Sequence, residues 1–298
     1  MTSDIQSPPA TAFRMAGPLR LLTWPALDAS GVVAVVTARS GGVSSGPYAT
    51  LNLSLSVGDD PGRVLENRRR LAAAFGAAPG DFVFARQVHG AGVAVVAEAD
   101  RGSGTQSLDD AIGGADALVT TSPGVTLAIL TADCVPIVLH DPVAGVLACV
   151  HAGWRGTVAR ATGAALAAME ALGARPADVR AGIGPAIGPD RYQVGAEVAD
   201  AARDALRPFL RPDGTGAWLF DLWAANRFLL REGGVPDRNI HVAGVPTGPD
   251  PGLFFSDRTA RPLHSSYRAI PIHPEPYASG MGDSLTWESP SRPSPYGR

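Results

Sequence analysis

The sequence predicts a single domain of the α+β class, with helices layered on a mixed sheet. Short apolar runs separated by turns fill residues 81–150, and their continuous apolar character is typical of strands covered on both faces. Strand and helix patterns alternate irregularly, which favours a mixed sheet over a repeated unit. The 298 residues could form one large domain or two, and no internal repeat divides them. We expect the domain to span residues 21–270.

The two ends of the chain differ from the region between them. Residues 1–20 are mixed polar and contain Pro8 and Pro9, so we expect them to be flexible. They lack the basic start and apolar block of a signal peptide. Residues 271–298 are dense in proline, serine and glycine, which predicts a disordered tail.

Helix and strand signals place the elements between these ends. Asp60 and Pro61 are typical of an N-cap and a first helical turn, so a helix should run from there to about Gly76. An apolar stripe at helical spacing predicts a long helix over 154–172, which Gly173 would cap. Further helices are expected at 197–206 and 222–232. Strands are expected at 32–38, 82–85, 93–97, 117–120, 125–130, 136–140 and 146–150.

Composition excludes several classes of protein. Apolar residues make up 45% of the chain and charged residues 18%, as in ordinary globular proteins. The net charge of −3 offers no broad basic field, so we expect no nucleic-acid partner. No apolar run approaches the roughly 18 residues of a membrane span, so no membrane partner is expected either. Two cysteines without a secretory signal indicate a reducing, cytoplasmic location.

Two histidines and a cysteine are candidate metal ligands. His89 precedes a glycine after one apolar run, Cys134 follows Asp133 after another, and His151 ends a third. Two imidazoles and a thiolate would hold zinc and leave a fourth position open, as catalytic zinc sites do. The spacing is not that of a zinc finger, so two other interpretations stay open. Cys134 and the histidines could be core residues, or His151 could activate Cys134 as a nucleophile.

Other residues of the same types receive different interpretations. Cys149 shares a strand face with His151, but their Cβ atoms would lie roughly 6 to 7 Å apart, so we interpret Cys149 as core. His140 is interpreted as structural. Arg155 opens the expected long helix, where partial positive charge favours an anion. Arg39, in the glycine loop after the first strand, is a second candidate for an anion contact.

Nine motifs occur in an order that closely resembles the YfiH family, whose members are also called laccase-domain or polyphenol oxidase proteins. They are Arg-Ser-Gly-Gly-Val-Ser at 39–44, Leu-Asn-Leu at 51–53, Val-Gly-Asp-Asp at 57–60, Asn-Arg at 67–68, Arg-Gln-Val-His-Gly at 86–90, Ala-Asp-Ala-Leu-Val-Thr at 115–120, Thr-Ala-Asp-Cys-Val-Pro at 131–136, Val-His-Ala-Gly-Trp-Arg-Gly at 150–156 and Ile-Gly-Pro-Ala-Ile at 183–187. The resemblance covers about Val35 to Ser256, and the motifs that contain Cys134 and His151 are highly specific.

The resemblance implies a fold like the deamidase domain of cytotoxic necrotizing factor. It implies zinc bound by His89, Cys134 and His151, with copper the less favoured metal. The implied activity is purine nucleoside phosphorolysis, in which phosphate displaces the base from adenosine, inosine, guanosine or methylthioadenosine. Some members also deaminate adenosine, and bacterial relatives are often labelled peptidoglycan editing factors.

The phosphorylase interpretation assigns roles to further residues. Arg39, Arg155 and Asn52 would bind the substrates, with the two arginines on phosphate. Asp133 would orient a ligand or move protons, and Gln87 would hydrogen-bond the substrate. Arg155 would also act in catalysis by stabilising negative charge.

Three other functions stay open. The pair of Cys134 and His151 would suit a cysteine-type amide hydrolase, such as an editing factor for peptidoglycan precursors. A copper polyphenol oxidase, or laccase, would need many more histidines than the six present. Residues 244–261 depart from the family's usual Cys-Thr and Arg-Arg-Asp-Gly segments, which leaves a non-catalytic partner protein as the third possibility. The oligomeric state is not predicted.

Overall fold

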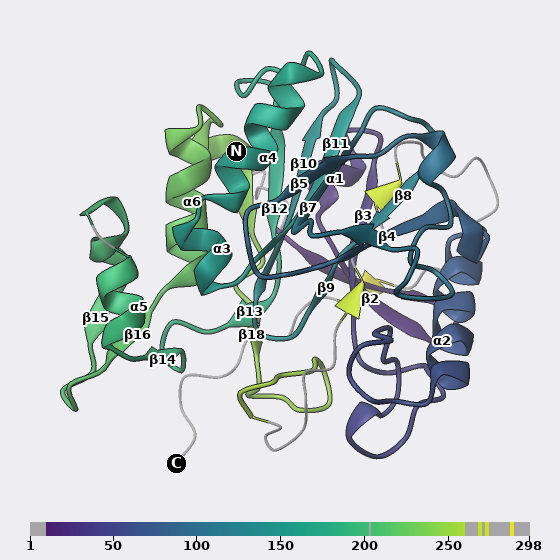
Figure 1. The fold of residues 1–298 in the computed structure, drawn as a ribbon, viewed down its shortest axis with the longest axis horizontal. Helices are drawn as coiled ribbons and strands as arrows, with labels where there is room; N and C mark the ends of the chain where they lie inside the picture. Colours follow the sequence, from purple (N-terminus) through teal and green to yellow (C-terminus); the bar gives the residue numbers. More distant parts are fainter. Residues whose placement is uncertain (1–9, 203, 260–267, 270–271, 274–286, 289–298) are drawn as a thin grey trace, which may run out of the picture.

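The fold consists of two stacked β-sheets with helices on their outer faces (Figure 1). It is a computed structural model that describes residues 10–202, 204–259, 268–269, 272–273 and 287–288. Its α-helices are α1 (Pro25–Asp28), α2 (Pro61–Ala74), α3 (Trp154–Val158), α4 (Ala161–Ala171), α5 (Ala196–Ala201) and α6 (Leu222–Glu232). Helices α4 and α6 cover one sheet and α2 covers the other, so the layers follow the order helix, sheet, sheet, helix.

The first sheet has six strands in the order β17-β12-β10-β11-β7-β5. They are β17 (Ile240–Val242), β12 (Arg180–Ile183), β10 (Val135–Asp141), β11 (Val146–Ala152), β7 (Ala117–Thr120) and β5 (Val93–Val95). β10 and β11 form an antiparallel hairpin, while β12 with β17 and β5 with β7 are parallel pairs. The predicted α+β domain with a mixed sheet is therefore confirmed.

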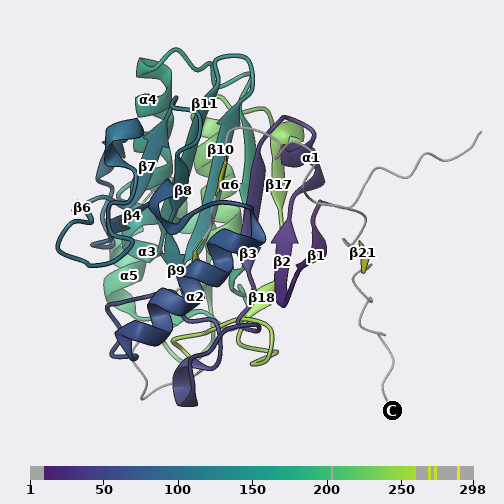
Figure 2. The same ribbon diagram turned by 90° about the vertical axis from the view of Figure 1, so that its right-hand side faces the viewer.

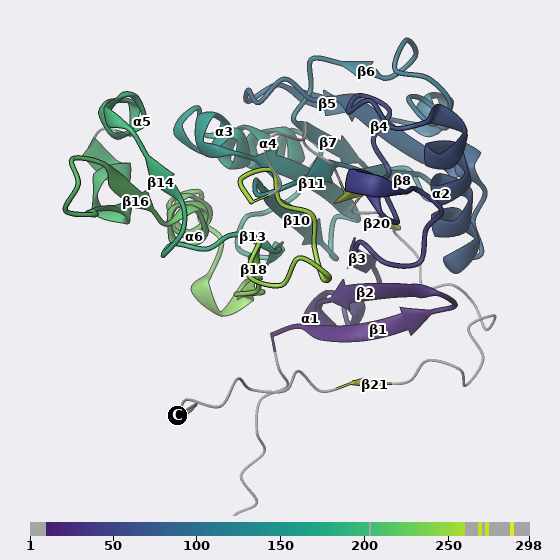
Figure 3. The same cartoon turned by 90° about the horizontal axis from the view of Figure 1, so that it is seen from below.

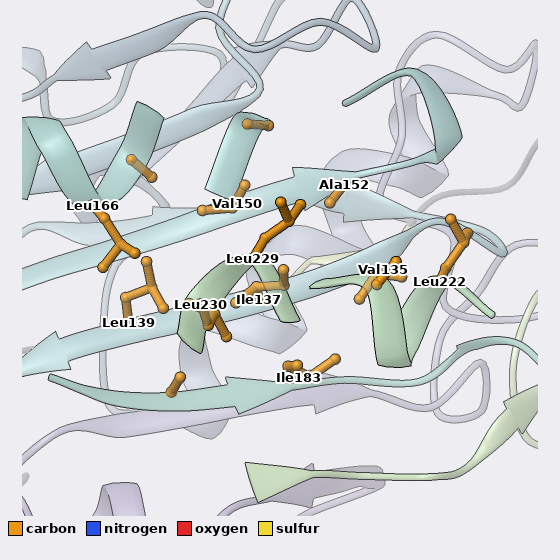
Figure 4. Close-up of a cluster of buried hydrophobic side chains, with 14 of the residues drawn as sticks. Val135, Ile137, Leu139, Val150, Ala152, Leu166, Ile183, Leu222, Leu229 and Leu230 are labelled. Carbon is orange, nitrogen blue, oxygen red and sulfur yellow. The ribbon is translucent and has the colours of Figure 1, made fainter. Parts of the chain in front are cut away.

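Alternation along β10 and β11 divides the core into two layers. Val135, Ile137 and Leu139 face α4 and α6, where they pack against leucines such as Leu166 and Leu229 (Figure 4). The residues between them face the second sheet, and Cys149 belongs to this layer with no exposed surface. Period-2 alternation therefore explains why these strands are apolar throughout, and it confirms Cys149 as core.

The second sheet has eight strands in the order β21-β1-β2-β3-β20-β8-β4-β6. They are β21 (Trp287–Glu288), β1 (Ala12–Ala16), β2 (Leu19–Thr23), β3 (Val33–Thr37), β20 (Ile272–His273), β8 (Thr126–Ala128), β4 (Phe82–Arg86) and β6 (Ile112–Gly113). Figure 2 shows α2 lying across the outer side of this sheet. As predicted, α2 begins after Asp60, whose carboxylate accepts a hydrogen bond from the amide of Arg63 at 2.9 Å.

Three small sheets complete the fold. They pair β13 (Ala186–Ile187) with β18 (Pro246–Thr247), β9 (Leu130–Thr131) with β19 (Arg268–Ala269), and β14 (Gln193–Val194) with β16 (Trp218–Phe220) and β15 (Leu210–Pro212). The sheet that contains β14 lies with α5 at the end of the molecule opposite α2 (Figure 3). The segment that follows β18, residues 248–258, lies between β14 and β3.

The structure differs from the predictions at both ends of the chain. The expected flexibility of residues 1–20 does not hold from residue 12 onward, because β1 and β2 form a hairpin around Gly17 and Pro18. Gly17 has a φ of +57°, and Leu19 and Leu22 are fully buried, so the turn and the apolar side chains stabilise this hairpin. The expected disorder of 271–298 falls mostly outside the described residues, and within them β20 and β21 pair with the second sheet.

The predicted helix over 154–172 is two helices. α3 ends at Val158, and Arg160, with a φ of +61°, stands before α4. Asn226 of α6 holds the break, because it donates to the Thr157 hydroxyl and accepts from the Thr162 hydroxyl, both at 2.9 Å. The predicted strand over 125–130 is likewise divided between β8 and β9. No helix in the described ranges is long and apolar enough to cross a membrane.

Candidate metal centre

Three strand ends bring His89, Cys134 and His151 together. His89 follows β4, Cys134 lies in the turn between β9 and β10, and His151 lies near the end of β11. Their donor atoms, two imidazole nitrogens and one sulfur, all lie within 4.8 Å of one another. The two imidazole rings meet edge to face, with centroids 4.7 Å apart. This group could bind a metal ion, and in the described part of the chain it is the one group of three or more such side chains that could.

The backbone at this group is held in an uncommon conformation. His89 has a φ of +59° and Asp133 a φ of +78°, in the left-handed region that non-glycine residues rarely adopt. Gly153 approaches the site so closely that a Cβ atom on it would lie 2.7 Å from the Cys134 sulfur. Such strain is typical of functional sites, where the surrounding contacts must maintain it.

A buried carboxylate, that of Asp116, maintains the conformation of both histidines. It accepts hydrogen bonds from three consecutive amides, those of Val88 at 3.2 Å, His89 at 3.0 Å and Gly90 at 2.7 Å. It also accepts a hydrogen bond from Nδ1 of His151 at 2.7 Å. Burial would raise the pKa of Asp116, but these hydrogen bonds outweigh burial and lower it, so the carboxylate stays charged.

The arrangement around His151 matches what a metal ligand needs. Its Nδ1 is bound to Asp116, and its Nε2 is buried without a hydrogen-bond partner among the described residues. A carboxylate on one ring nitrogen of a histidine fixes the tautomer that presents the other nitrogen to a metal. An unpaired buried nitrogen beside a thiol and a second imidazole therefore fits a metal ion.

Without a metal, the same groups hold their protons differently. Burial would raise the pKa of the Cys134 thiol, but the positive charges of His151 and His89 outweigh burial and lower it to about 7. Burial would lower the pKa of His151, but Cys134 and Asp116 raise it to about 9. Metal binding would replace these protons, because a thiolate and a neutral imidazole are the ligand forms.

Asp133 connects this group to the C-terminal part of the chain. Its buried carboxylate accepts hydrogen bonds from the Thr247 hydroxyl, from the Ser256 hydroxyl at 3.0 Å and from the Arg258 amide at 2.8 Å. Since Asp133 directly precedes Cys134, segment 248–258 is attached beside the candidate ligands. Segment 248–258 therefore contacts the site, although its sequence departs from the family pattern.

Two other predicted site residues use their polar groups within the protein. The Gln87 amide donates to the Leu130 carbonyl at 2.8 Å and accepts from the Leu130 amide at 2.7 Å. Asn52 is buried, and it donates to Asp59 at 2.9 Å and accepts from the amide of Ser54. These contacts connect strand ends and loops, and among the described residues no hydrogen bond joins the Gln87 or Asn52 side chain to the three candidate ligands.

The two predicted arginines lie in different surroundings. Arg39 donates to the carbonyl oxygens of Ala49 and Pro251, each at 2.7 Å, and its guanidinium lies over the Phe255 ring. It therefore also holds segment 248–258. Arg155 is exposed at the start of α3, with its guanidinium 4.3 Å from the centroid of the Trp154 ring.

Sequence reasoning missed Asp116, Tyr192 and Arg258. A signal for Asp116 exists, because it ends a polar loop directly before the apolar run 117–120, as the candidate ligands stand at the ends of apolar runs. Tyr192 and Arg258 lie in turns without periodicity, so no local signal points to them.

The fold and the three converging side chains define an α+β protein with one candidate metal centre in its described part. A family model described as multi-copper polyphenol oxidoreductase laccase matches residues 33–264. The chain belongs to this family, and the resemblance of its motifs to the YfiH family is thereby confirmed.

Known proteins of similar sequence and structure carry several names. A protein of Geobacillus stearothermophilus named purine nucleoside phosphorylase YlmD is 41% identical over 237 residues, which cover 78% of this chain and 86% of that protein. A protein of an unknown prokaryotic organism named adenosine deaminase RL5 is 42% identical, over 78% of this chain and 90% of that protein. The crystal structure of the Bacillus licheniformis hypothetical protein YfiH matches with a TM-score of 0.83 at 33% identity, over 88% of this chain and 98% of that one.

Proposed function

We propose that this protein is a zinc-dependent purine nucleoside phosphorylase. A phosphate oxygen forms a bond to C1′ of the nucleoside while the bond from C1′ to the purine nitrogen breaks. The purine leaves with the electron pair and takes up a proton, and the other product is the sugar 1-phosphate. Adenosine, inosine, guanosine and methylthioadenosine are the proposed substrates. The convergence of His89, Cys134 and His151, with the unpaired Nε2 of His151, carries the proposal.

The chain's own residues prepare this site for a metal and a substrate. Zinc held by the three side chains would keep one position open and would supply positive charge beside the substrate. Asp116 keeps the proton of His151 on Nδ1, so that the Nε2 lone pair faces the site. It also fixes the turn that carries His89, so both imidazoles depend on one carboxylate.

Zinc fits this site better than the copper of the family description. Two nitrogens and one sulfur form a single group in the described part of the chain. A multi-copper oxidase would need several such groups, and the six histidines of the chain are too few for them. Cys134 and Cys149 are free thiols, and we place the protein in the cytoplasm because a reducing compartment keeps such a ligand in the thiol form.

We assign supporting roles to four of the predicted site residues. Asp133 and Arg39 hold segment 248–258 beside the site, through hydrogen bonds to its side chains and main chain. Gln87 positions β9, which leads to Cys134, and Asn52 holds the loop that follows β3. These four residues would hold the loops and strands around the substrate site in place. Arg155 is exposed, so its guanidinium could bind phosphate.

Adenosine deamination is proposed as a side activity, since one relative bears that name. A separate second candidate is cysteine-type amide hydrolysis, favoured by the line from Cys134 through His151 to Asp116. A thiol, an imidazole and an orienting carboxylate are the parts of a cysteine nucleophile. In that case a chelator should leave the activity intact, and Cys134→Ser should abolish it.

The test combines metal analysis with a product assay. Protein purified without added metal should contain about one zinc per chain, and Cys134→Ala should contain almost none. The wild-type protein should release hypoxanthine from inosine when phosphate is present, and a chelator should stop the release. Absence of base release from both inosine and adenosine in zinc-loaded protein would reject the phosphorylase.

A further inference from the structure

Segment 248–258 carries an arginine, Arg258, to the turn that precedes Cys134. The main-chain amide of Arg258 donates to Asp133 at 2.8 Å, and Asp133 precedes the candidate ligand Cys134. The Ser256 hydroxyl donates to the same carboxylate oxygen of Asp133, at 3.0 Å. The start of the Arg258 side chain is therefore fixed close to the candidate metal centre.

The guanidinium of Arg258 lies beside a tyrosine. It donates to the Gln193 carbonyl at 3.0 Å, and it lies 5.4 Å from the centroid of the Tyr192 ring. Tyr192 is itself held, because its carbonyl accepts from the amide of Phe220 at 3.0 Å and its ring stacks on the Phe220 ring. The small sheet of β14, β15 and β16 thus forms one wall of the site, and Arg258 packs on this wall at Tyr192 and Gln193.

Arg155 comes to the same turn from α3, because Gly153, two residues before it, lies so close to Cys134 that a Cβ atom on it would be 2.7 Å from the sulfur. Burial raises the pKa of Tyr192, as does the charge of Cys134, whereas the positive charges of Arg258 and Arg155 lower it. Among the described residues, neither guanidinium group has a carboxylate partner within salt-bridge distance.

We propose that Arg155 and Arg258 together bind the phosphate co-substrate, with Tyr192, beside Arg258, as a positioning residue. Two guanidinium groups without acidic partners suit an oxyanion, which accepts several charge-assisted hydrogen bonds at once. Their place beside Cys134 puts the phosphate next to the nucleoside at the metal. This inference rests on the proposed phosphorylase function and adds the binding residues for its second substrate.

The Asp133 carboxylate connects the proposed phosphate site to segment 248–258, which is distant from it in the sequence. Arg155 comes from the six-stranded sheet side through α3, and Arg258 comes from the turn after β18. Asp133 brings the second to the turn that carries Cys134, by binding Ser256 and Arg258. The phosphate site would thus form only when segment 248–258 is attached.

The test measures phosphorolysis of inosine at varied phosphate concentration in zinc-loaded Arg258→Gln, Arg258→Lys and Arg155→Gln. Each Gln variant should raise the KM for phosphate about 10- to 100-fold, because a hydrogen bond to a charged group contributes about 1.5 to 3 kcal/mol. The KM for inosine and the zinc content should stay unchanged. Arg258→Lys should recover part of the loss, and Arg238→Gln, on an exposed turn before β17, should behave as wild type.

Tyr192 is tested by two variants that separate packing from the hydroxyl. Tyr192→Phe keeps the ring beside Arg258 and should leave the KM for phosphate within about threefold of wild type. Tyr192→Ala removes the wall and should raise that KM by about tenfold, with little change in kcat at saturating phosphate. An equal loss of kcat with unchanged KM in both variants would overturn the positioning role.

Calorimetry of inorganic phosphate binding, without nucleoside, separates this inference from the proposed function. Phosphate binding that is lost in Arg258→Gln would support the two-arginine site even if no base is released, and then the phosphorylase alone would fail. Phosphorolysis with an unchanged KM for phosphate in both Gln variants would overturn the two-arginine site and leave the phosphorylase standing. Loss of zinc from Arg258→Gln would also overturn it, since the residue would then act on the metal centre.

Discussion

The base of the site and its wall are built in different ways. The base consists of His89, Cys134, His151 and Asp116, and its side chains come from strand ends that the two large sheets hold in place. The wall consists of Arg258, Tyr192 and the turn of segment 248–258, which is attached through the carboxylate of Asp133 and the guanidinium of Arg39. The base is therefore determined by the core, and the wall depends on a few hydrogen bonds.

This difference suggests that the base and the wall have separate roles, metal binding and substrate binding. A buried base with left-handed backbone at His89 can hold a metal in one geometry, because the core resists rearrangement. A wall held by side-chain hydrogen bonds can detach at a small cost, since each such bond contributes about 1 kcal/mol. We therefore expect changes in the base to affect metal content and changes in the wall to affect the substrates.

The largest expected effect comes from Gly153→Ala, which places a Cβ atom 2.7 Å from the Cys134 sulfur. The sulfur must move, and overpacking of this kind costs about 1 to 3 kcal/mol. We expect zinc content to fall by more than about tenfold and base release to fall with it. Elemental analysis and the hypoxanthine assay measure both.

The matched control for this change is Gly80→Ala, because a Cβ atom on Gly80 would meet no atom within 4 Å. Gly80→Ala should keep both zinc and activity. Full zinc content in Gly153→Ala would show that the base of the site tolerates rearrangement, which contradicts the rigid base described above.

The next largest effect is expected from Asp116→Asn. The amide can no longer accept from three main-chain amides and from Nδ1 of His151 with a full negative charge. We expect zinc affinity to fall about 10- to 100-fold, as for other carboxylates behind a metal-binding histidine. Competition with a chromophoric chelator measures the affinity. Asp100→Asn, which changes the cap of a turn at Ala97, is the control and should leave zinc affinity unchanged.

The base was largely predictable from the sequence, and the wall was not. His89, Cys134 and His151 each stand at the end of an apolar run, so alternation alone places them at sheet edges. Their meeting at one point depends on the order of strands in the sheets, for which the family motifs were needed. Asp116 has the same local signal. It was missed because it binds His151 through a hydrogen bond to Nδ1 and is not itself a candidate metal ligand.

The wall escapes prediction for a physical reason. Thr247, Ser256 and Arg258 lie in a two-residue strand and in turns, where no hydrophobic period marks which side chain faces inward. Arg160 poses a similar problem, because an arginine in the left-handed region leaves no mark in the sequence, and the division of the helix at 154–172 could not be foreseen. The hairpin at residues 12–23 was in principle readable from its turn at Gly17 and Pro18.

Asp133→Asn tests the wall directly, and a smaller effect is expected. Asparagine tolerates the left-handed backbone of Asp133 about as well as aspartate, so Cys134 should stay in place. The amide would lose the charge that attracts Ser256 and the Arg258 amide, at a cost of about 1 to 3 kcal/mol. We expect full zinc content, a KM for phosphate raised several-fold and faster proteolysis within 248–258.

The comparison of Asp133→Asn with Asp116→Asn is sharper than either variant alone. Both remove one buried negative charge near Cys134, but only the second should release zinc. If both variants lose zinc to the same extent, the base and the wall are one cooperative unit. Ser256→Ala, which removes one of the hydrogen bonds to Asp133, should show a weaker form of the Asp133→Asn result.

The smallest expected effect concerns the end of the β10 and β11 hairpin that lies away from the metal centre. His151 pairs with Pro136 at the site end, and His140 pairs with Leu147 at the other end. Burial lowers the pKa of His140 to about 4, helped by Arg180 and opposed by Asp141. Its Nδ1 donates to the Ser30 hydroxyl at 2.9 Å, because that hydroxyl itself donates to the Leu27 carbonyl. With a pKa of about 4, the imidazole of the native state is neutral at neutral pH.

The sign of the pH dependence follows from this lowered pKa. The unfolded chain binds the proton near pH 6.5 and the native state near pH 4, so His140 stabilises the fold fully above pH 6.5 and loses that stabilisation as the pH falls to about 4. Urea unfolding of wild type between these values should show uptake of about one more proton than His140→Gln shows. Equal pH dependence in the two proteins would mean that the fold does not lower the pKa of His140, and the contrast between the two ends of the hairpin would then be lost.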